Sequence, residues 1–146
     1  MMVFRKLLPV FLAFFATLGA AAQETAGPKN PIDRALDECL AKQRATMPRA
    51  ECYSTALGAW EKETADNYAA LLEILPAPVG KALRASQAAW EKYRDAEFEY
   101  ISKIYADRRG SGYIAVRIIE RTRIVRDRAV ELKQRLVAAR SAETEK

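Results

Sequence analysis

The 146-residue sequence is long enough for one domain, and its 24 Lys and Arg against 19 Asp and Glu give a formal net charge of +5. It has two cysteines and no histidine, so it offers few metal ligands and lacks the commonest general base of enzymes. The charge is too small to select a partner by itself. Composition therefore favours a binding or structural protein over an enzyme.

Residues 1–22 have the pattern of a cleaved secretory signal peptide. Arg5 and Lys6 form a positive start, an apolar run covers 7–18, and three alanines precede Gln23 as a small-residue cleavage site. The apolar run is too short to span a bilayer comfortably. We therefore expect a periplasmic or secreted protein, whose net charge falls from +5 to +3 once both cations are removed.

The first predicted helix follows a flexible lead-in at residues 23–30. Asn30 as N-cap, Pro31 at the first helical position and Asp33 in the first turn are typical of a helix start. Cys39 keeps the spacing of the apolar residues in this helix and is expected to face inward.

The second predicted helix runs from about Pro48 to Leu75, where Pro76 and Pro78 stop it. Its inward face follows helical spacing, with polar residues Glu63 and Asn67 at the edges. The residues of that face are Tyr53, Leu57, Trp60, Thr64, Tyr68, Leu71 and Leu75.

The two cysteines predict one disulfide. Cys39 and Cys52 form an even pair in an exported chain, and their bond would tie the first helix to the second. It would close a loop of about 14 residues and stabilise the fold by roughly 3 kcal/mol. We expect no metal and no cofactor.

The third predicted helix, from about Val79 to Asp107, carries polar residues on its apolar face. Gln87, Arg94 and Glu97 lie within the stripe instead of opposite it, so they need partners if the face is buried. The apolar members of the stripe are Leu83, Trp90, Phe98, Ile101 and Tyr105.

Two interpretations of this polar block remain open, and the structural one is favoured. As a binding site, Gln87 and Arg94 would line a groove between helices, with Trp90 and Tyr93 as aromatic anchors. As a structural network, Arg94 would lie over Trp90 and pair with a carboxylate, fixing the register of the second and third helices. Glu63 and Asn67 would be the partners of Gln87 and Arg94, and the carboxylate for Arg94 would be Glu63 or Glu97. The residues assigned to this network are Glu63, Asn67, Gln87, Trp90, Tyr93, Arg94, Asp95 and Glu97.

The fourth predicted helix begins near Ser111, after a Gly-containing break, and reaches about Arg140, followed by a charged tail at 141–146. Its apolar face is Ile114, Ile118, Thr122, Val125, Ala129, Leu132 and Leu136. One row is basic and consists of Arg117, Arg121, Arg128 and Arg135. Such a row could bind phosphate groups or an acidic protein. Pairing within the helix, for which Arg117 and Glu120, Arg123 and Asp127, and Glu131 and Arg135 have the spacing, explains it better.

The predicted fold is an all-α, antiparallel helical bundle of one short and three long helices over residues 31–140, with one disulfide. The near-heptad spacing of the long helices would permit a coiled-coil dimer, but the prolines and the glycine break favour a monomer folded back on itself.

Several short patterns together resemble the LprI-type lysozyme inhibitor domain family. They are Cys39, Thr46, Met47 and Cys52; Tyr68-x-x-Leu71; Gln87-x-x-Trp90-x-x-Tyr93-Arg94-Asp95; Gly110-Ser111; and Arg126-x-Arg128-x-x-x-Leu132. The resemblance covers roughly Ile32 to Leu136, and its most specific part is the block that begins at Gln87. It implies a small exported helical domain that binds its partner without catalysis.

If the resemblance extends to activity, lysozyme is the expected partner and occlusion of its substrate cleft the expected mechanism. The residues between the third and fourth helices offer cations, a hydroxyl and an aromatic anchor on flexible glycines. The candidate partner-binding loop is therefore Arg108, Arg109, Ser111 and Tyr113. The alternative is an envelope structural or stress-related module that binds lipid headgroups, peptidoglycan or another envelope protein. Export makes nucleic acid an unsuitable partner.

Overall fold

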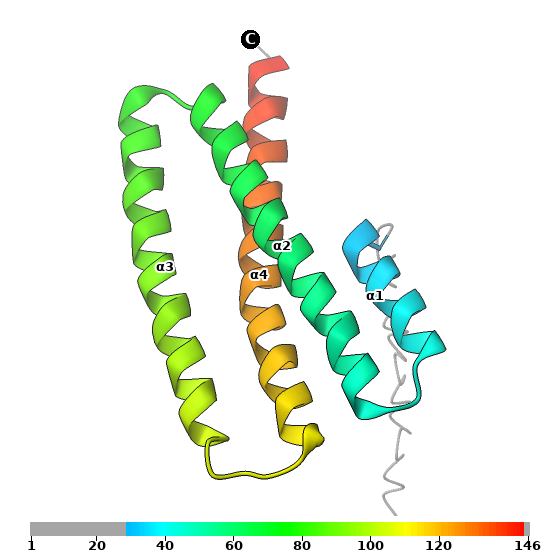
Figure 1. Cartoon of the computed structure of the whole chain (residues 1–146). Helices are drawn as coiled ribbons and strands as arrows, with labels where there is room; N and C mark the ends of the chain where they lie inside the picture. The colour runs from blue at the N-terminus through cyan, green and yellow to red at the C-terminus, as the bar shows by residue number, and fades with distance from the viewer. Residues whose placement is uncertain (1–28, 145–146) are drawn as a thin grey trace, which may run out of the picture.

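The computed structural model describes residues 29–144 and folds them into four α-helices joined by short turns (Figure 1). The helices are α1 (Pro31–Lys42), α2 (Thr46–Ile74), α3 (Ala77–Ile104) and α4 (Ser111–Thr144). One helix is short and three are long, so the predicted all-α bundle is confirmed. The predicted signal peptide and most of the lead-in lie outside the described residues. No helix within residues 29–144 is apolar over a long enough stretch to cross a membrane.

The helix ends follow local sequence signals. Asn30 caps α1, its Oδ1 accepting a hydrogen bond of 2.8 Å from the Ile32 backbone N–H. Pro78, predicted to help stop the second helix, lies instead in the first turn of α3, where the missing N–H costs nothing. At its other end α3 finishes at Ile104, before the predicted Asp107, whereas α4 passes the predicted end and reaches Thr144.

Successive helices run in opposite directions, so α2 and α4 run the same way and lie side by side in the middle of the molecule (Figure 1). This central pair is the most extensively packed, and its core is formed by Trp60, Val125, Ala129 and Leu132, all 0% exposed. Ala129 packs in the same cluster as the Trp60 indole, because its small side chain leaves room for the ring. Apolar packing therefore fixes α2 against α4 independently of their polar contacts.

The other two helices flank this pair. α3 packs mainly on α4 and only slightly on α2. Its apolar attachment includes Leu83, which joins Leu71, Leu132 and Leu136 near the α2–α3 turn. On the opposite side, α1 packs on α2 and is tied to it by the predicted disulfide, which is confirmed between Cys39 and Cys52, with 5.8 Å between their Cα atoms.

Candidate functional site

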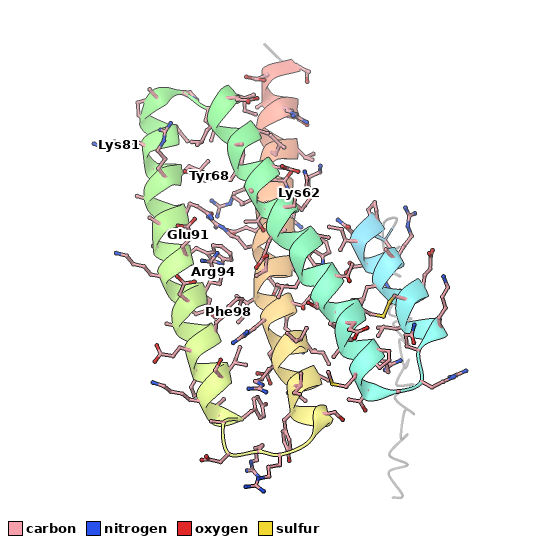
Figure 2. All side chains as sticks on the ribbon, in the orientation of Figure 1. Lys62, Tyr68, Lys81, Glu91, Arg94 and Phe98 are labelled. Atoms are coloured by element: carbon pink, nitrogen blue, oxygen red, sulfur yellow. A yellow bond between two sulfur atoms is a disulfide. The ribbon has the colours of Figure 1, made fainter. Side chains whose placement is uncertain are left out.

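The polar block of α3 borders a groove between α2 and α3. The cavity has a volume of about 170 Å³, and its lining includes Gln87, Trp90 and Arg94. Tyr68, Glu91 and Arg94 lie in the space between these helices in Figure 2. The full lining is Glu61, Thr64, Ala65, Tyr68, Gln87, Trp90, Glu91, Arg94 and Val125. The groove exists because α3 contacts α2 so slightly.

Gln87 is the buried member of the block, with 7% of its surface exposed. Its Oε1 accepts hydrogen bonds of 3.2 and 3.0 Å from Nε and Nη2 of Arg128 in α4. Its Nε2 donates to Oε1 of Glu91 at 3.1 Å. The predicted partners on α2 are therefore wrong, since Gln87 links α3 to α4.

Glu63 and Asn67 lie on the side of α2 that faces α4. Asn67 is 3% exposed and donates from Nδ2 to the Ala129 carbonyl at 3.3 Å and to Glu63 Oε1 at 3.2 Å. Glu63 in turn lies 3.8 Å from Nζ of Lys133. The prediction that these residues bind Gln87 and Arg94 fails because their face of α2 packs on a different helix.

Arg94 has the predicted aromatic contact but a different carboxylate. Its guanidinium lies over Trp90, 5.3 Å from the ring centroid, which confirms the stacking. Its ion pair is with the neighbouring Asp95 at 2.7 Å, so the predicted pairing with Glu63 or Glu97 is wrong. The Arg94 side chain is 29% exposed and hence not a buried charge. Tyr93 is exposed and does not line the groove.

The buried arginine of the bundle is Arg128, whose side chain is 4% exposed. Besides its bonds to Gln87, it pairs through Nη1 with Glu131 at 2.8 Å and lies 5.7 Å from the Trp90 ring centroid. Burial opposes ionisation of Glu131, yet the hydrogen bond from Arg128 and the charges of Arg128 and Arg135 lower its pKa overall. Sequence reasoning placed Arg128 in the basic row, although it lies three residues after Val125 in the apolar stripe.

The basic row is therefore not a continuous binding surface. Arg121 crosses to α3, where Nη2 donates to Ser102 Oγ at 2.6 Å and to the Phe98 carbonyl at 3.3 Å. Arg135 pairs with Glu131 as predicted. The other two predicted pairs do not form between the described side chains, and Arg117 makes no ion pair there. The four arginines thus have different environments.

The turn between α3 and α4 presents the candidate loop. Arg108, Arg109 and Ser111 are exposed, and neither arginine forms an ion pair with a described residue. Gly110 has φ of +112°, a conformation that side chains disfavour.

Two tyrosines flank this turn. The Tyr105 and Tyr113 rings lie 5.9 Å apart, and the Tyr105 hydroxyl donates to Glu120 at 2.9 Å. That hydrogen bond raises the pKa of Tyr105. These contacts brace both sides of the turn while its arginines remain free.

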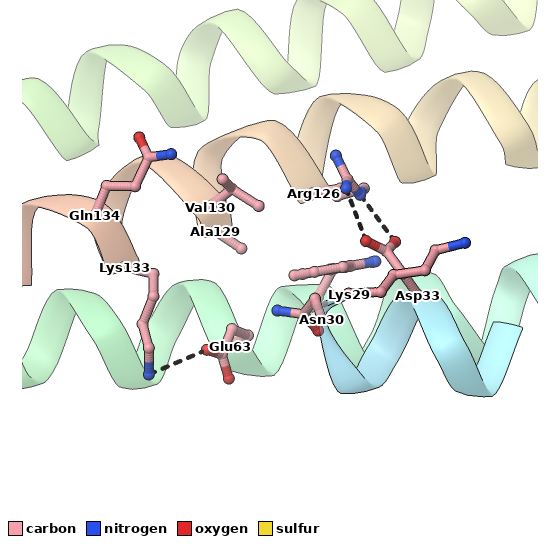
Figure 3. Close-up of a pocket in the computed structure, with 10 residues that line it drawn as sticks. Lys29, Asn30, Asp33, Glu63, Arg126, Ala129, Val130, Lys133 and Gln134 are labelled. Carbon is pink, nitrogen blue, oxygen red and sulfur yellow. Dashed lines mark hydrogen bonds and ion pairs between the residues drawn. The ribbon is translucent and has the colours of Figure 1, made fainter. Parts of the chain in front are cut away.

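An ion pair that sequence reasoning missed ties α1 to α4. Asp33, 8% exposed, accepts hydrogen bonds from Arg126 Nε at 2.9 Å and Nη2 at 2.7 Å, and these bonds lower the pKa of the Asp33 carboxyl (Figure 3). Arg126 also lies over the Trp60 ring at 5.5 Å from its centroid. The pair borders a cavity of about 310 Å³ between α1, α2 and α4. Asp33 had been interpreted only as a helix-start residue.

The polar contacts described above fix the helices against one another. Within residues 29–144 no group of three or more His, Cys, Asp or Glu side chains could hold a metal ion. Buried polar contacts join α4 to each of the other three helices, and two exposed arginines that form no ion pair with a described residue, Arg108 and Arg109, lie at the α3–α4 turn. The fold and these contacts define a small disulfide-tied helical domain with a surface suited to binding.

Comparison with known proteins specifies the family. A family model described as lysozyme inhibitor LprI matches residues 39–132, most of the chain, so the chain belongs to the LprI lysozyme inhibitor family. The match includes the block from Gln87 to Asp95 and Arg128. The resemblance seen in the sequence is therefore confirmed.

The fold is also similar to a crystal structure of an uncharacterized protein from Burkholderia thailandensis. The TM-score is 0.73 at 26% sequence identity, and the similarity covers 78% of this chain and 57% of the other. This chain thus matches little more than half of that protein. No curated protein matches the sequence.

Proposed function

We propose that this protein is a non-enzymatic inhibitor that binds lysozyme and blocks its substrate cleft with the α3–α4 turn. The family's name supports lysozyme as the partner. Glycosidases of this kind act through a pair of carboxyl groups that flank the scissile bond in a cleft. A cationic turn that enters such a cleft would meet both carboxyl groups and exclude the glycan.

The observation that carries this proposal is the pair of exposed arginines, Arg108 and Arg109, with no ion pair to a described residue. A guanidinium donates two parallel hydrogen bonds to a carboxylate, a geometry that an ammonium group cannot reproduce. Because neither arginine pairs with a carboxylate among residues 29–144, binding need not break an ion pair within that range. The braced turn also loses less conformational entropy on binding than a flexible segment would.

The buried polar contacts have a supporting role in this proposal. The turn is held between the end of α3 and the start of α4, so its position depends on how these helices pack. Arg128 with Gln87, and Arg121 with Ser102, fix α3 on α4 along their length. The network would then position the inhibitory turn without touching lysozyme.

The test is the release of soluble glycan from peptidoglycan by lysozyme in the presence of the purified protein. We expect inhibition by the unchanged chain and at least a tenfold weaker effect for Arg108→Ala with Arg109→Ala, because buried arginine anchors dominate binding. The matched control is Lys81→Ala with Arg84→Ala, which removes the same charge at the opposite end of α3 (Figure 2).

Both double variants should keep the helix content of the unchanged protein. Full inhibition by the Arg108 and Arg109 variant would refute the turn as the inhibitory element. Failure of the unchanged protein to slow several types of lysozyme at micromolar concentration would refute inhibition itself. Export to the periplasm or the exterior remains a proposal based on residues 1–22, and cleavage after Ala22 would support it.

A further inference from the structure

We infer that one end of the bundle docks onto an anionic phospholipid surface. This basic end consists of residues 42–49, around the α1–α2 turn, and residues 103–117, around the α3–α4 turn. The inference goes beyond lysozyme inhibition, because it proposes a different partner and adds side chains outside the turn proposed to enter the enzyme.

Charge is strongly concentrated in these two segments. They contain seven Lys and Arg and one acidic residue, Asp107, for a net charge of +6. The whole described range 29–144 has 21 Lys and Arg against 17 Asp and Glu, or +4, so the remainder is net negative. The seven cations are Lys42, Arg44, Arg49, Lys103, Arg108, Arg109 and Arg117.

Most of these cations are free to meet an external anion. Lys103 pairs with Glu99 at 2.6 Å, and Arg49 donates to the carbonyls of Leu40 and Gln43. The other five form no ion pair with a described residue. An anionic membrane surface attracts each such cation, and the attraction adds up across the patch.

The two segments lie at the same end of the molecule, although about 60 residues separate them in the sequence (Figure 1). A small cavity is lined by Thr46 and Arg49 from α2 and by Ala115 and Ile119 from α4, which places the starts of these helices side by side. One turn further in, Thr122 Oγ1 donates to the Tyr53 carbonyl at 3.3 Å. The two groups of cations therefore lie at the same end of the bundle.

Exposed apolar side chains lie within the same segments. Met47, Ile104 and Ile114 are 41%, 43% and 39% exposed, and each lies at or near a different helix end. Cations alone would suit an acidic protein or polymer. The combination with apolar side chains matches a lipid interface, where headgroups take the charges and the acyl boundary takes the apolar groups.

The helix termini add a weaker contribution of the same sign. Both α2 and α4 begin at this end, neither has an acidic residue in its first turn, and Ala45 gives α2 no side-chain cap. The N–H groups of a helix start carry partial positive charge and bind phosphate oxygens. The patch thus lacks the acidic residues that usually offset this charge.

The test is co-sedimentation of the full chain, as processed by the expression host, with phosphatidylcholine vesicles that contain about one third phosphatidylglycerol. We expect binding at about 50 mM salt, loss of binding at about 500 mM, and no binding to pure phosphatidylcholine. Every variant carries the same N-terminal segment, so differences among variants report on the basic end.

Two variants separate this inference from lysozyme inhibition, because both leave the α3–α4 turn arginines intact. Lys42→Gln with Arg44→Gln should weaken vesicle binding about tenfold or more, and Met47→Ser with Ile104→Ser should weaken it while preserving its salt dependence. Both should inhibit lysozyme like the unchanged protein. The matched control, Lys81→Gln with Arg84→Gln at the other end of α3, should bind vesicles normally.

Equal weakening by the control, or no binding of the unchanged protein to anionic vesicles, would overturn the inference. The inference would also be overturned if the Met47 and Ile104 variant bound vesicles fully and bound soluble polyphosphate with equal affinity. That result would assign the basic end to anionic polymers. None of these results bears on lysozyme inhibition, which is measured without vesicles.

Discussion

Replacing Arg128 by methionine tests how α3 is held on α4. Methionine keeps much of the aliphatic stem of arginine but removes the guanidinium that joins Gln87, Glu131 and Trp90. Glu131 is half-exposed and keeps Arg135 as a partner, so it does not become an isolated buried charge. Gln87 is different, because its Oε1 is buried and loses both donors from Arg128.

The expected loss in the free energy of unfolding is about 3 kcal/mol. A buried acceptor left without a donor costs about 1 to 3 kcal/mol, and loss of the contact with the Trp90 ring adds about 1 kcal/mol. Relief of the cost of burying a charge offsets part of this sum. For a domain of this size the loss lowers the melting temperature by roughly 10 °C.

The assay is urea unfolding followed by circular dichroism, with three comparison variants. Arg128→Met with Gln87→Leu removes donor and acceptor together and should recover about 2 kcal/mol of the loss. Arg135→Met, which removes the exposed partner of the same carboxylate, and Arg94→Ala should each cost less than about 1 kcal/mol. If Arg128→Met costs no more than Arg135→Met, or if the double variant shows no recovery, the reasoning about the buried bond is refuted.

Two further predictions concern acid stability and the α3–α4 turn. The pKa of Asp33 is lowered in the folded state, so its contribution to stability is complete above the unfolded pKa near 4 and is lost as pH falls through the folded pKa. Asp33→Asn should be about 2 kcal/mol less stable than the unchanged protein at pH 7, and its free energy of unfolding in urea should decline less steeply from pH 5 to pH 2.5. Parallel curves for the two proteins would contradict this. Gly110→Ala should lower the melting temperature, because alanine in a left-handed backbone conformation costs about 1 kcal/mol. Gly112→Ala lies inside α4 with open space around it and should raise the melting temperature slightly. An equal response of both variants would show that the backbone conformation at Gly110 does not matter.

The fold was predictable because its signals are local. Asn30 before Pro31 starts a helix by satisfying a free N–H, and a glycine break separates the last two helices. The disulfide followed from two cysteines near one predicted turn. Each of these features depends on residues close together in the chain, so the printed sequence contains the needed information.

The partners of the buried polar residues were not predictable in the same way. Helical periodicity identifies which face of a helix is buried, but not which neighbouring helix covers it. Glu63 and Asn67 were assigned to α3 because α2 and α3 are consecutive. In the structure α2 packs chiefly on α4, which lies next to it in space and runs in the same direction.

Arg94 and Arg128 illustrate the limit most clearly, since both lie within apolar stripes and both guanidinium groups approach Trp90. Their burial differs because α3 stands away from α2 at Arg94, leaving a groove of about 170 Å³, while α3 and α4 close over Arg128. A partly solvated arginine can rely on the adjacent Asp95. A buried arginine needs hydrogen-bond acceptors, and Gln87 on another helix supplies one through its Oε1. Arg94 therefore forms only a weak surface ion pair, whereas Arg128, the same residue type in a similar stripe, is the main polar link between α3 and α4.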